Sequence, residues 1–233
     1  LIQDWRAQYP ERADMANSTL KALLAHTAAD LGNAGPDLQY GYGSIRTKAA
    51  VEHLRGDSHL EAEVSSGETF EFLVITYAGD EQLQITLAWD DEPAVPLVLP
   101  SLVNDLDLVV FAPDGTRQYP WAIDPANPGD PATRAAEDHL NNIEQVTVAS
   151  PQAGVWRVQV AGYAVPVGPQ AFSIMATPDL VACSSTGIVG LDRAAYPLEG
   201  ELSVTVVDCD LNLDDTAIDT IDVLVRSDDE PVG

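Results

Sequence analysis

The chain has 233 residues, and its hydrophobic fraction of 45% is typical of a packed globular protein rather than a disordered one. Thirty-seven acidic side chains against eleven basic ones give a formal net charge of −26 at pH 7. This charge disfavours nucleic acid and anionic membrane as partners, because their phosphates would be repelled. Saline or calcium-rich surroundings fit better, since counterions screen the self-repulsion.

Residues 1–57 predict short helices and hold seven acidic and six basic side chains, against thirty and five in the remainder. The first helix should end at Pro10. The second should be capped by Asn17 or Ser18 and closed by Gly32, with its apolar positions at helical spacing: Leu20, Leu23, Leu24, Ala28 and Leu31. A third helix is expected over 44–55. Three helices with one-sided apolar faces are typical of the rim of a larger body.

From residue 58 to 178 the apolar period changes to two, which predicts strands separated by turns. The expected strands are 61–65, 69–77, 82–89, 105–111, 117–119, 143–148, 155–161 and 171–176. Eight strands with long connections at 90–104 and 120–142 favour a jelly-roll β-sandwich. The sequence contains no run of about 18 apolar residues, so no membrane span is predicted.

Residues 179–233 predict a third, partial module of immunoglobulin-like strands, which is about half of an ordinary sandwich. Its unmatched edge would need a strand from elsewhere, so self-association through that edge is one expectation. The two cysteines, Cys183 and Cys209, fall in this part of the chain. They predict one disulfide and an oxidising compartment, with two free buried thiols as the alternative.

A candidate metal site lies in the sandwich. Asp105 and Asp107 flank Leu106, so the two-residue period of a strand places both carboxylates on one face. Two like charges repel unless something positive lies between them, and a calcium ion would supply that charge. Further oxygen ligands are expected from the following stretch, at Asp138, Asn141, Asn142 and Glu144. The alternative is that both aspartates point into water beside a turn.

The second helix with the Gly-rich loop 35–43 and Ala49-Ala50-Val51 resembles the closing segment of subtilisin-like serine protease catalytic domains. The stretch from Trp89 to Phe172 resembles the β-sandwich that follows the catalytic domain in the oxidatively stable alkaline protease branch, related to the proprotein-convertase P-domain. The resemblance covers about residues 1–178. It implies a mainly β chain: a helical remnant of an α/β catalytic domain (1–57), a P-domain-like jelly roll (58–178) and the partial module (179–233).

The family cuts peptide bonds with an Asp/His/Ser triad, and its Gly-Thr-Ser-Met-Ala nucleophile motif does not occur in this chain. His26 is expected on a helix surface, and His53, His59 and His139 show no carboxylate–hydroxyl arrangement that would argue for a triad. We therefore expect no catalytic residue here and no activity from this chain alone.

The resemblance implies the post-catalytic region of a secreted, extracellular subtilase. Its partners would be the rest of the catalytic domain and, through the parent enzyme, protein substrates. The alternative is a non-catalytic extracellular adhesive or assembly module that completes its half-sandwich with a neighbour's strand.

Overall fold

The computed structural model describes residues 1–56, 58–96, 101–181, 188–191 and 204–207. Three short helices precede the strands in this part of the chain: α1 (Ile2–Gln8), α2 (Asn17–His26) and α3 (Thr47–Arg55). The strands are β1 (His59–Val64), β2 (Thr69–Thr76), β3 (Gln82–Trp89), β4 (Asp105–Phe111), β5 (Arg117–Gln118), β6 (Ile143–Ala149), β7 (Gly154–Ala164), β8 (Gln170–Thr177), β9 (Leu180–Val181), β10 (Ile188–Leu191) and β11 (Val204–Val207).

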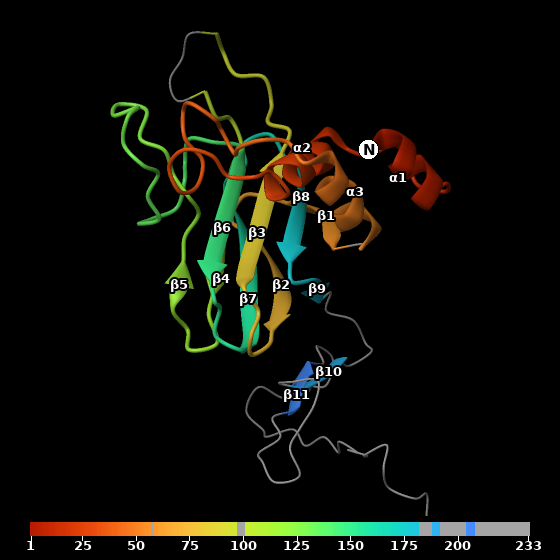
Figure 1. Cartoon of the computed structure of the whole chain (residues 1–233). Helices are drawn as coiled ribbons and strands as arrows, with labels where there is room; N and C mark the ends of the chain where they lie inside the picture. The colour runs from red at the N-terminus through yellow and green to blue at the C-terminus, as the bar shows by residue number, and fades with distance from the viewer. Residues whose placement is uncertain (57, 97–100, 182–187, 192–203, 208–233) are drawn as a thin grey trace, which may run out of the picture.

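The strands between β1 and β9 form two facing antiparallel sheets (Figure 1). One sheet has the order β1-β8-β3-β6 and the other β5-β4-β7-β2-β9. Strands that follow one another in the sequence mostly lie in opposite sheets, which is the jelly-roll arrangement. The prediction of a mainly β chain with a jelly-roll sandwich is confirmed.

The sandwich core follows from the period of two along each strand. In β7 the burial alternates, so that Trp156, Val158 and Val160 point between the sheets. They belong to the same buried cluster as Ile85 and Leu87 of β3 in the facing sheet. Alternation of this kind puts one face of each strand in the core.

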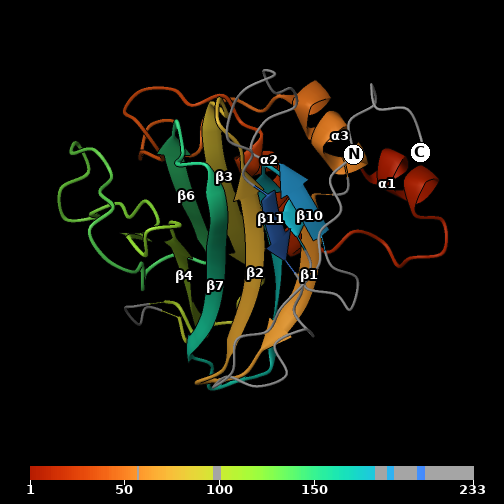
Figure 2. The same cartoon turned by 90° about the horizontal axis from the view of Figure 1, so that it is seen from below.

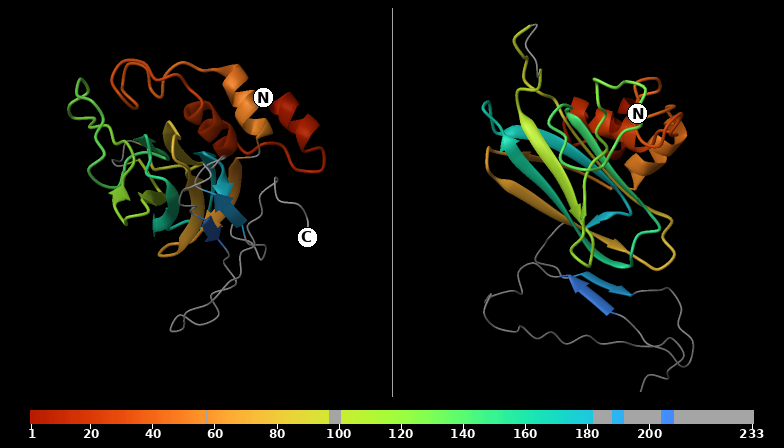
Figure 3. Two further views of the ribbon diagram at one scale, coloured as in Figure 1. Left: turned by 60° about the horizontal axis from the view of Figure 1, so that its bottom comes forward. Right: turned by 90° about the vertical axis from the view of Figure 1, so that its left-hand side faces the viewer.

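Strand β3 is buried on both faces, because helix α2 covers the outer face of its sheet. Ala22 and Leu23 of α2 pack in one cluster with Ala88 of β3 and Met175 of β8. The helices lie on one side of the sandwich only (Figures 2 and 3). The apolar faces predicted for the helices therefore pack, at least in part, against the sandwich itself.

Helix α2 is shorter than predicted. It begins after Ala16, so Asn17 lies inside the helix, and it ends at His26 rather than near Gly32. The chain leaves the helix at Thr27, whose hydroxyl donates to the Leu23 carbonyl. Ala29 then pairs with Ser44 through two backbone hydrogen bonds. This pairing competes with helix continuation and explains the early end.

The partial immunoglobulin-like module expected over 179–233 lies mostly outside the described residues, as do Cys183 and Cys209. Within this region the structure describes β9 and the antiparallel pair β10–β11. The self-association expected through the edge of this module and the disulfide remain predictions.

Candidate metal centre

Three potential ligands meet at the end of the sandwich where β3 ends and β4 begins. Asp105 and Asp107 come from the start of β4, and His139 comes from the loop before β6. The His139 Nδ1 lies 2.9 Å from an oxygen of Asp105 and 3.3 Å from an oxygen of Asp107. Both carboxylates therefore reach one atom, in agreement with the one-face placement predicted from their spacing.

The two aspartates lie in a largely buried environment. Asp107 is only 8% exposed, and Oδ1 of each aspartate is buried without a hydrogen-bond partner. Burial is the main cause that raises the pKa of Asp105, opposed by His139. Burial likewise raises the pKa of Asp107 to about 6, with His139 opposing and the nearby Asp105 reinforcing the change.

Glu144 of β6 is the most deeply buried acid of the group, with no exposed surface. Its Oε2 accepts a hydrogen bond of 2.8 Å from the backbone N–H of Leu108, while Oε1 has no hydrogen-bond partner. Burial raises the pKa of Glu144 well above its ordinary value, and the charges of Asp138, Asp107 and Asp105 act in the same direction. A buried, half-satisfied carboxylate beside three others is costly unless a cation or a proton neutralises it.

The remaining predicted ligands are placed differently. Asp138 is 2% exposed, and its two oxygens accept hydrogen bonds from the Leu140 N–H and the Asn141 amide. Its charge acts on Asp105, Asp107 and Glu144. Asn142 instead donates its amide to the Trp89 carbonyl. The structure thus brings Asp105 and Asp107 together at His139 and places Asp138 and Glu144 near enough for their charges to act on them. Asn141 is bonded to Asp138, and Asn142 turns to β3.

His139 is the member of this centre that sequence reasoning missed. Its side chain is 43% exposed, and its ring stacks on Tyr163 of β7 with the ring centroids 4.3 Å apart. The sequence held one signal, the position of His139 directly after the predicted ligand Asp138. His139 contacts β4 because the loop before β6 crosses the end of the sandwich. That crossing is a tertiary contact, so the spacing of residues along the chain does not predict it.

A hydrogen-bond network holds the chain in place at the same end of the sandwich. Asn104 is fully buried, and its amide donates to the Val167 carbonyl and the Gln170 side chain, while its Oδ1 accepts from the Val167 N–H. The carboxylate of Asp91 accepts the N–H groups of Val103 and Asn104. These contacts fix the chain just before Asp105.

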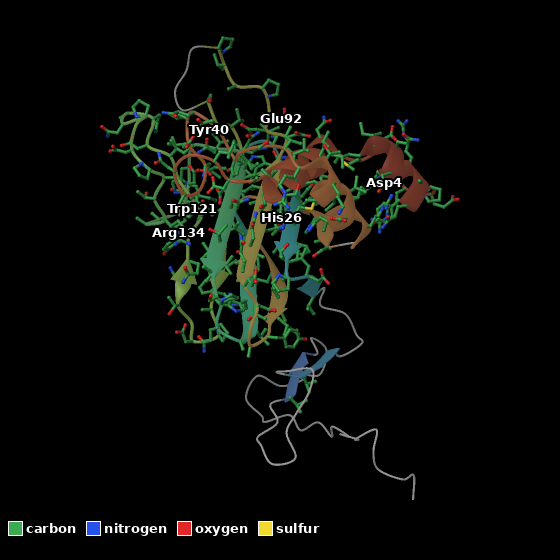
Figure 4. The ribbon with its side chains drawn as sticks, viewed as in Figure 1. Asp4, His26, Tyr40, Glu92, Trp121 and Arg134 are labelled. Carbon is green, nitrogen blue, oxygen red and sulfur yellow. The ribbon has the colours of Figure 1, made fainter. Side chains whose placement is uncertain are left out.

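A second feature is a pocket of about 740 Å³ on the outer face of the β3–β6 edge. Its walls include His26, His53, Gln145, Arg46 and Trp121. Figure 4 shows that His26 and Trp121 lie at separate places along this pocket, with Arg134 beside Trp121. Gly35 belongs to the rim: its φ is +78°, and a Cβ there would lie 2.6 Å from the Trp121 ring. Only glycine fits this approach.

The expectation that His26 lies on a helix surface was wrong. His26 is buried between α2 and the sheet, and its two ring nitrogens lie 2.9 Å from the hydroxyls of Thr86 and Thr177. The reason is that α2 packs flat on β3 and β8 and turns this position inward. Burial, then the nearby His53, lowers the pKa of His26 well below its ordinary value.

The chain is similar in sequence to two proteins of Dictyostelium discoideum. One is the serine protease/ABC transporter B family protein tagA, 25% identical over 169 residues, which are 68% of this chain and 10% of that protein. The other is the serine protease/ABC transporter B family protein tagB, 35% identical over 94 residues, which are 39% of this chain and 5% of that protein. No protein-family model matches the chain.

Among solved structures, the chain is similar to a periplasmic inhibitor of g-type lysozyme from Aeromonas hydrophila, with a TM-score of 0.27, 16% identity, and coverage of 51% of this chain and 83% of the other. A protein of Sulfurospirillum deleyianum gives a TM-score of 0.26 and 9% identity over 50% of this chain and 96% of the other. Both TM-scores are too low to indicate a shared function.

The chain spans a tenth or less of the curated relatives that it matches, so the similarity links it loosely to proteins named as serine proteases. In the described part of the chain, no helix has both the length and the apolar character needed to cross a bilayer.

Proposed function

We propose that this chain is a calcium-stabilised accessory sandwich in a secreted subtilisin-like serine protease, and that peptide-bond cleavage belongs to other parts of the same polypeptide. Two considerations support the proposal. The relatives matched in sequence carry a serine protease name, and the sequence between Trp89 and Phe172 resembles the post-catalytic sandwich of subtilases. Its role would be to support the catalytic domain and to present it to protein substrates.

The observation that carries the metal part of the proposal is the set of buried oxygens without hydrogen-bond partners: Asp105 Oδ1, Asp107 Oδ1 and Glu144 Oε1. In the described residues, the ion pairs of Asp105 and Asp107 are both with His139. One imidazole cannot balance four neighbouring carboxylates. Calcium prefers oxygen ligands and tolerates irregular geometry, so these residues fit it.

Asp105, Asp107, Glu144 and Asp138 are the residues that would hold the ion. A bound divalent cation would neutralise their mutual repulsion and fix the start of β4 to the start of β6. Because the unfolded chain lacks this arrangement, binding would stabilise the folded state in proportion to the logarithm of the calcium concentration above the Kd. Such stabilisation would suit a protein exposed to protease outside the cell.

The test is thermal unfolding of the chain in calcium, in magnesium and in chelator. We expect calcium to raise the Tm by several degrees, corresponding to about 2–4 kcal/mol at saturating metal. The double variant Asp105→Asn/Asp107→Asn should lose this increase, while Asp130→Asn, an exposed acid in the loop 120–142, should keep it. Equal midpoints in calcium and chelator would reject calcium as the stabilising ion.

The protease part of the proposal has a separate test. A Gly-Thr-Ser-Met-Ala-like run encoded shortly before Leu1 would support the subtilase parentage, and its absence from the encoded polypeptide would reject it. The expected activity would then disappear on replacing the serine of that run by alanine, with the sandwich still folded.

A further inference from the structure

The arrangement of Asp105, Asp107 and His139 differs from an oxygen-only calcium site in one respect, because its central atom is a nitrogen. The three ligand atoms lie within 4.8 Å of one another. His139 Nδ1 is the shared neighbour of both carboxylates, at 2.9 Å from Asp105 and 3.3 Å from Asp107. Calcium and magnesium select oxygen ligands, whereas an imidazole with carboxylates suits zinc and manganese.

The two distances from His139 Nδ1 match those between ligands of a small cation. Two ligand atoms about 2.1 Å from one ion lie about 3.0 Å apart at a right angle and about 3.4 Å apart at the tetrahedral angle. The two nitrogen–oxygen distances fall in or close to this range. An ion at this place would take over the position of the hydrogen that His139 Nδ1 shares with Asp105.

Three further observations indicate a prepared site rather than a chance cluster of acids. Asp107 is more than nine-tenths buried, and its Oδ1, which faces His139, has no hydrogen-bond partner. The imidazole is held by stacking on Tyr163. The surrounding charges are negative, since Glu137, Asp138 and Asp91 act on the two aspartates. The site therefore attracts cations and repels anions.

We infer that Asp105, Asp107 and His139 form a binding site for a transition-metal dication such as Zn²⁺, with His139 as the nitrogen ligand. The inference rests on the metal role proposed for the two aspartates. It adds that His139, rather than Glu144 or Asp138, completes the group of donor atoms that lie within 4.8 Å of one another in the described residues. The fourth position of a zinc ion here would face solvent, because His139 is partly exposed.

Calorimetric titration of the chain with ZnCl₂ and, separately, with CaCl₂ tests this. We expect one zinc ion per chain, and we expect His139→Ala to weaken zinc binding by about tenfold or more, since even the loss of a supporting residue costs that much. The same variant should leave calcium affinity within about threefold, because calcium does not need the nitrogen. His53→Gln, in the pocket on the other face of the sheet, is the matched control and should bind zinc normally.

The outcomes separate the two proposals. Zinc binding that depends on His139, with no calcium binding, supports the inference and rejects calcium as the ion of the proposed function. Calcium binding with zinc affinity unchanged in His139→Ala, or reduced equally in His53→Gln, overturns the inference and leaves the proposed function standing. Imidazole NMR signals of the unmodified chain give a measurement that needs no variant: zinc must shift those of His139, and unshifted signals overturn the inference.

Discussion

The carboxylate of Glu144 in β6 accepts a 2.8 Å hydrogen bond from the backbone N–H of Leu108 in β4, so a buried acid joins the two sheets of the sandwich. In the described residues, strand β5 pairs with β4 only at Val110 and Phe111. The N–H of Leu108 lies beyond this pairing and receives its acceptor from a side chain instead. The position needs an oxygen, but it does not by itself need a negative charge.

The first prediction concerns Glu144→Gln, which keeps an acceptor for Leu108 and removes the ionisable group. In chelator at pH 8 we expect the variant to be more stable than the unmodified chain, because folding then no longer buries an ionisable group beside other carboxylates. In calcium the order should reverse, because one proposed ligand is weakened. The measurement is urea unfolding with and without metal.

The matched control for Glu144→Gln is Glu63→Gln, an exposed acid of β1 at the edge of the same sheet. It should change stability by less than about 0.5 kcal/mol under both conditions. A loss of stability in Glu144→Gln in chelator would show that the ionised carboxylate is favourable at this place and would contradict the burial argument.

The second prediction is the pH dependence of the metal-free chain. The pKa of Asp107 is raised from 3.8 to about 6, chiefly by burial, so the folded state holds a proton that the unfolded state releases. This contribution to stability is complete below pH about 4 and is lost as the pH rises through about 6. In chelator, Asp107→Asn should flatten that part of the unfolding profile between pH about 4 and about 7. An unchanged slope would contradict the assignment.

Much of the fold was predictable from the sequence. Alternation within β3 and β7 and the turns between strands indicated the sandwich, because these signals depend on neighbours along the chain. The shared face of Asp105 and Asp107 followed from the same period. The end of α2 could not be predicted in this way. The bridge between Ala29 and Ser44 competes with the helix, and its two residues are fifteen positions apart in the sequence.

The candidate site was predictable as a set of oxygens but not as a geometry. Glu144 lies between the sheets because strand β5 pairs with β4 only at Val110 and Phe111. The N–H of Leu108 is therefore left without a backbone acceptor from β5 and can donate to the Glu144 carboxylate. The position of His139 depends on a loop crossing to β4, and the turn of Asn142 away from the group depends on the Trp89 carbonyl. Period and spacing contain no information on such contacts.

The third prediction concerns His26→Leu, which fills a similar volume without hydrogen bonds. Thr86 keeps a partner in Gln145, but Thr177 loses the ring. We expect a loss of about 1–3 kcal/mol at pH 8. Since burial lowers the pKa of His26, the unfolded state takes up the proton first, and stability from this group falls as the pH drops below 6.5. The variant should lack that acid-side slope.

Chemical unfolding at several pH values checks the His26 prediction. Lys48→Ala, an exposed change on α3, should behave like the unmodified chain. Full retention of stability in His26→Leu at pH 8 would show that the two hydroxyl contacts contribute nothing.

The fourth prediction concerns β6, which is the last strand of its sheet in the described part of the chain. Trp121 donates its backbone N–H to the Gln145 carbonyl, and the guanidinium of Arg134 donates to the Thr147 carbonyl while lying 4.4 Å from the centre of the Trp121 ring. Figure 4 shows these two side chains together. They occupy acceptors that another strand could otherwise pair with.

Arg134→Ala should therefore leave the Thr147 carbonyl free to accept a hydrogen bond from another strand, and it should remove the contact between Arg134 and the Trp121 ring beside β6. We expect a loss of about 1 kcal/mol in stability and association that increases with concentration, measured by light scattering after gel filtration. Arg157→Ala is the matched control, because Arg157 also lies over an aromatic ring, that of Phe111, but pairs with Glu71 inside the other sheet. Association in Arg134→Ala alone would locate the effect at the β6 edge. Association in both variants alike would contradict that assignment, and the lost positive charge could not explain it, because a more acidic chain repels its copies more strongly.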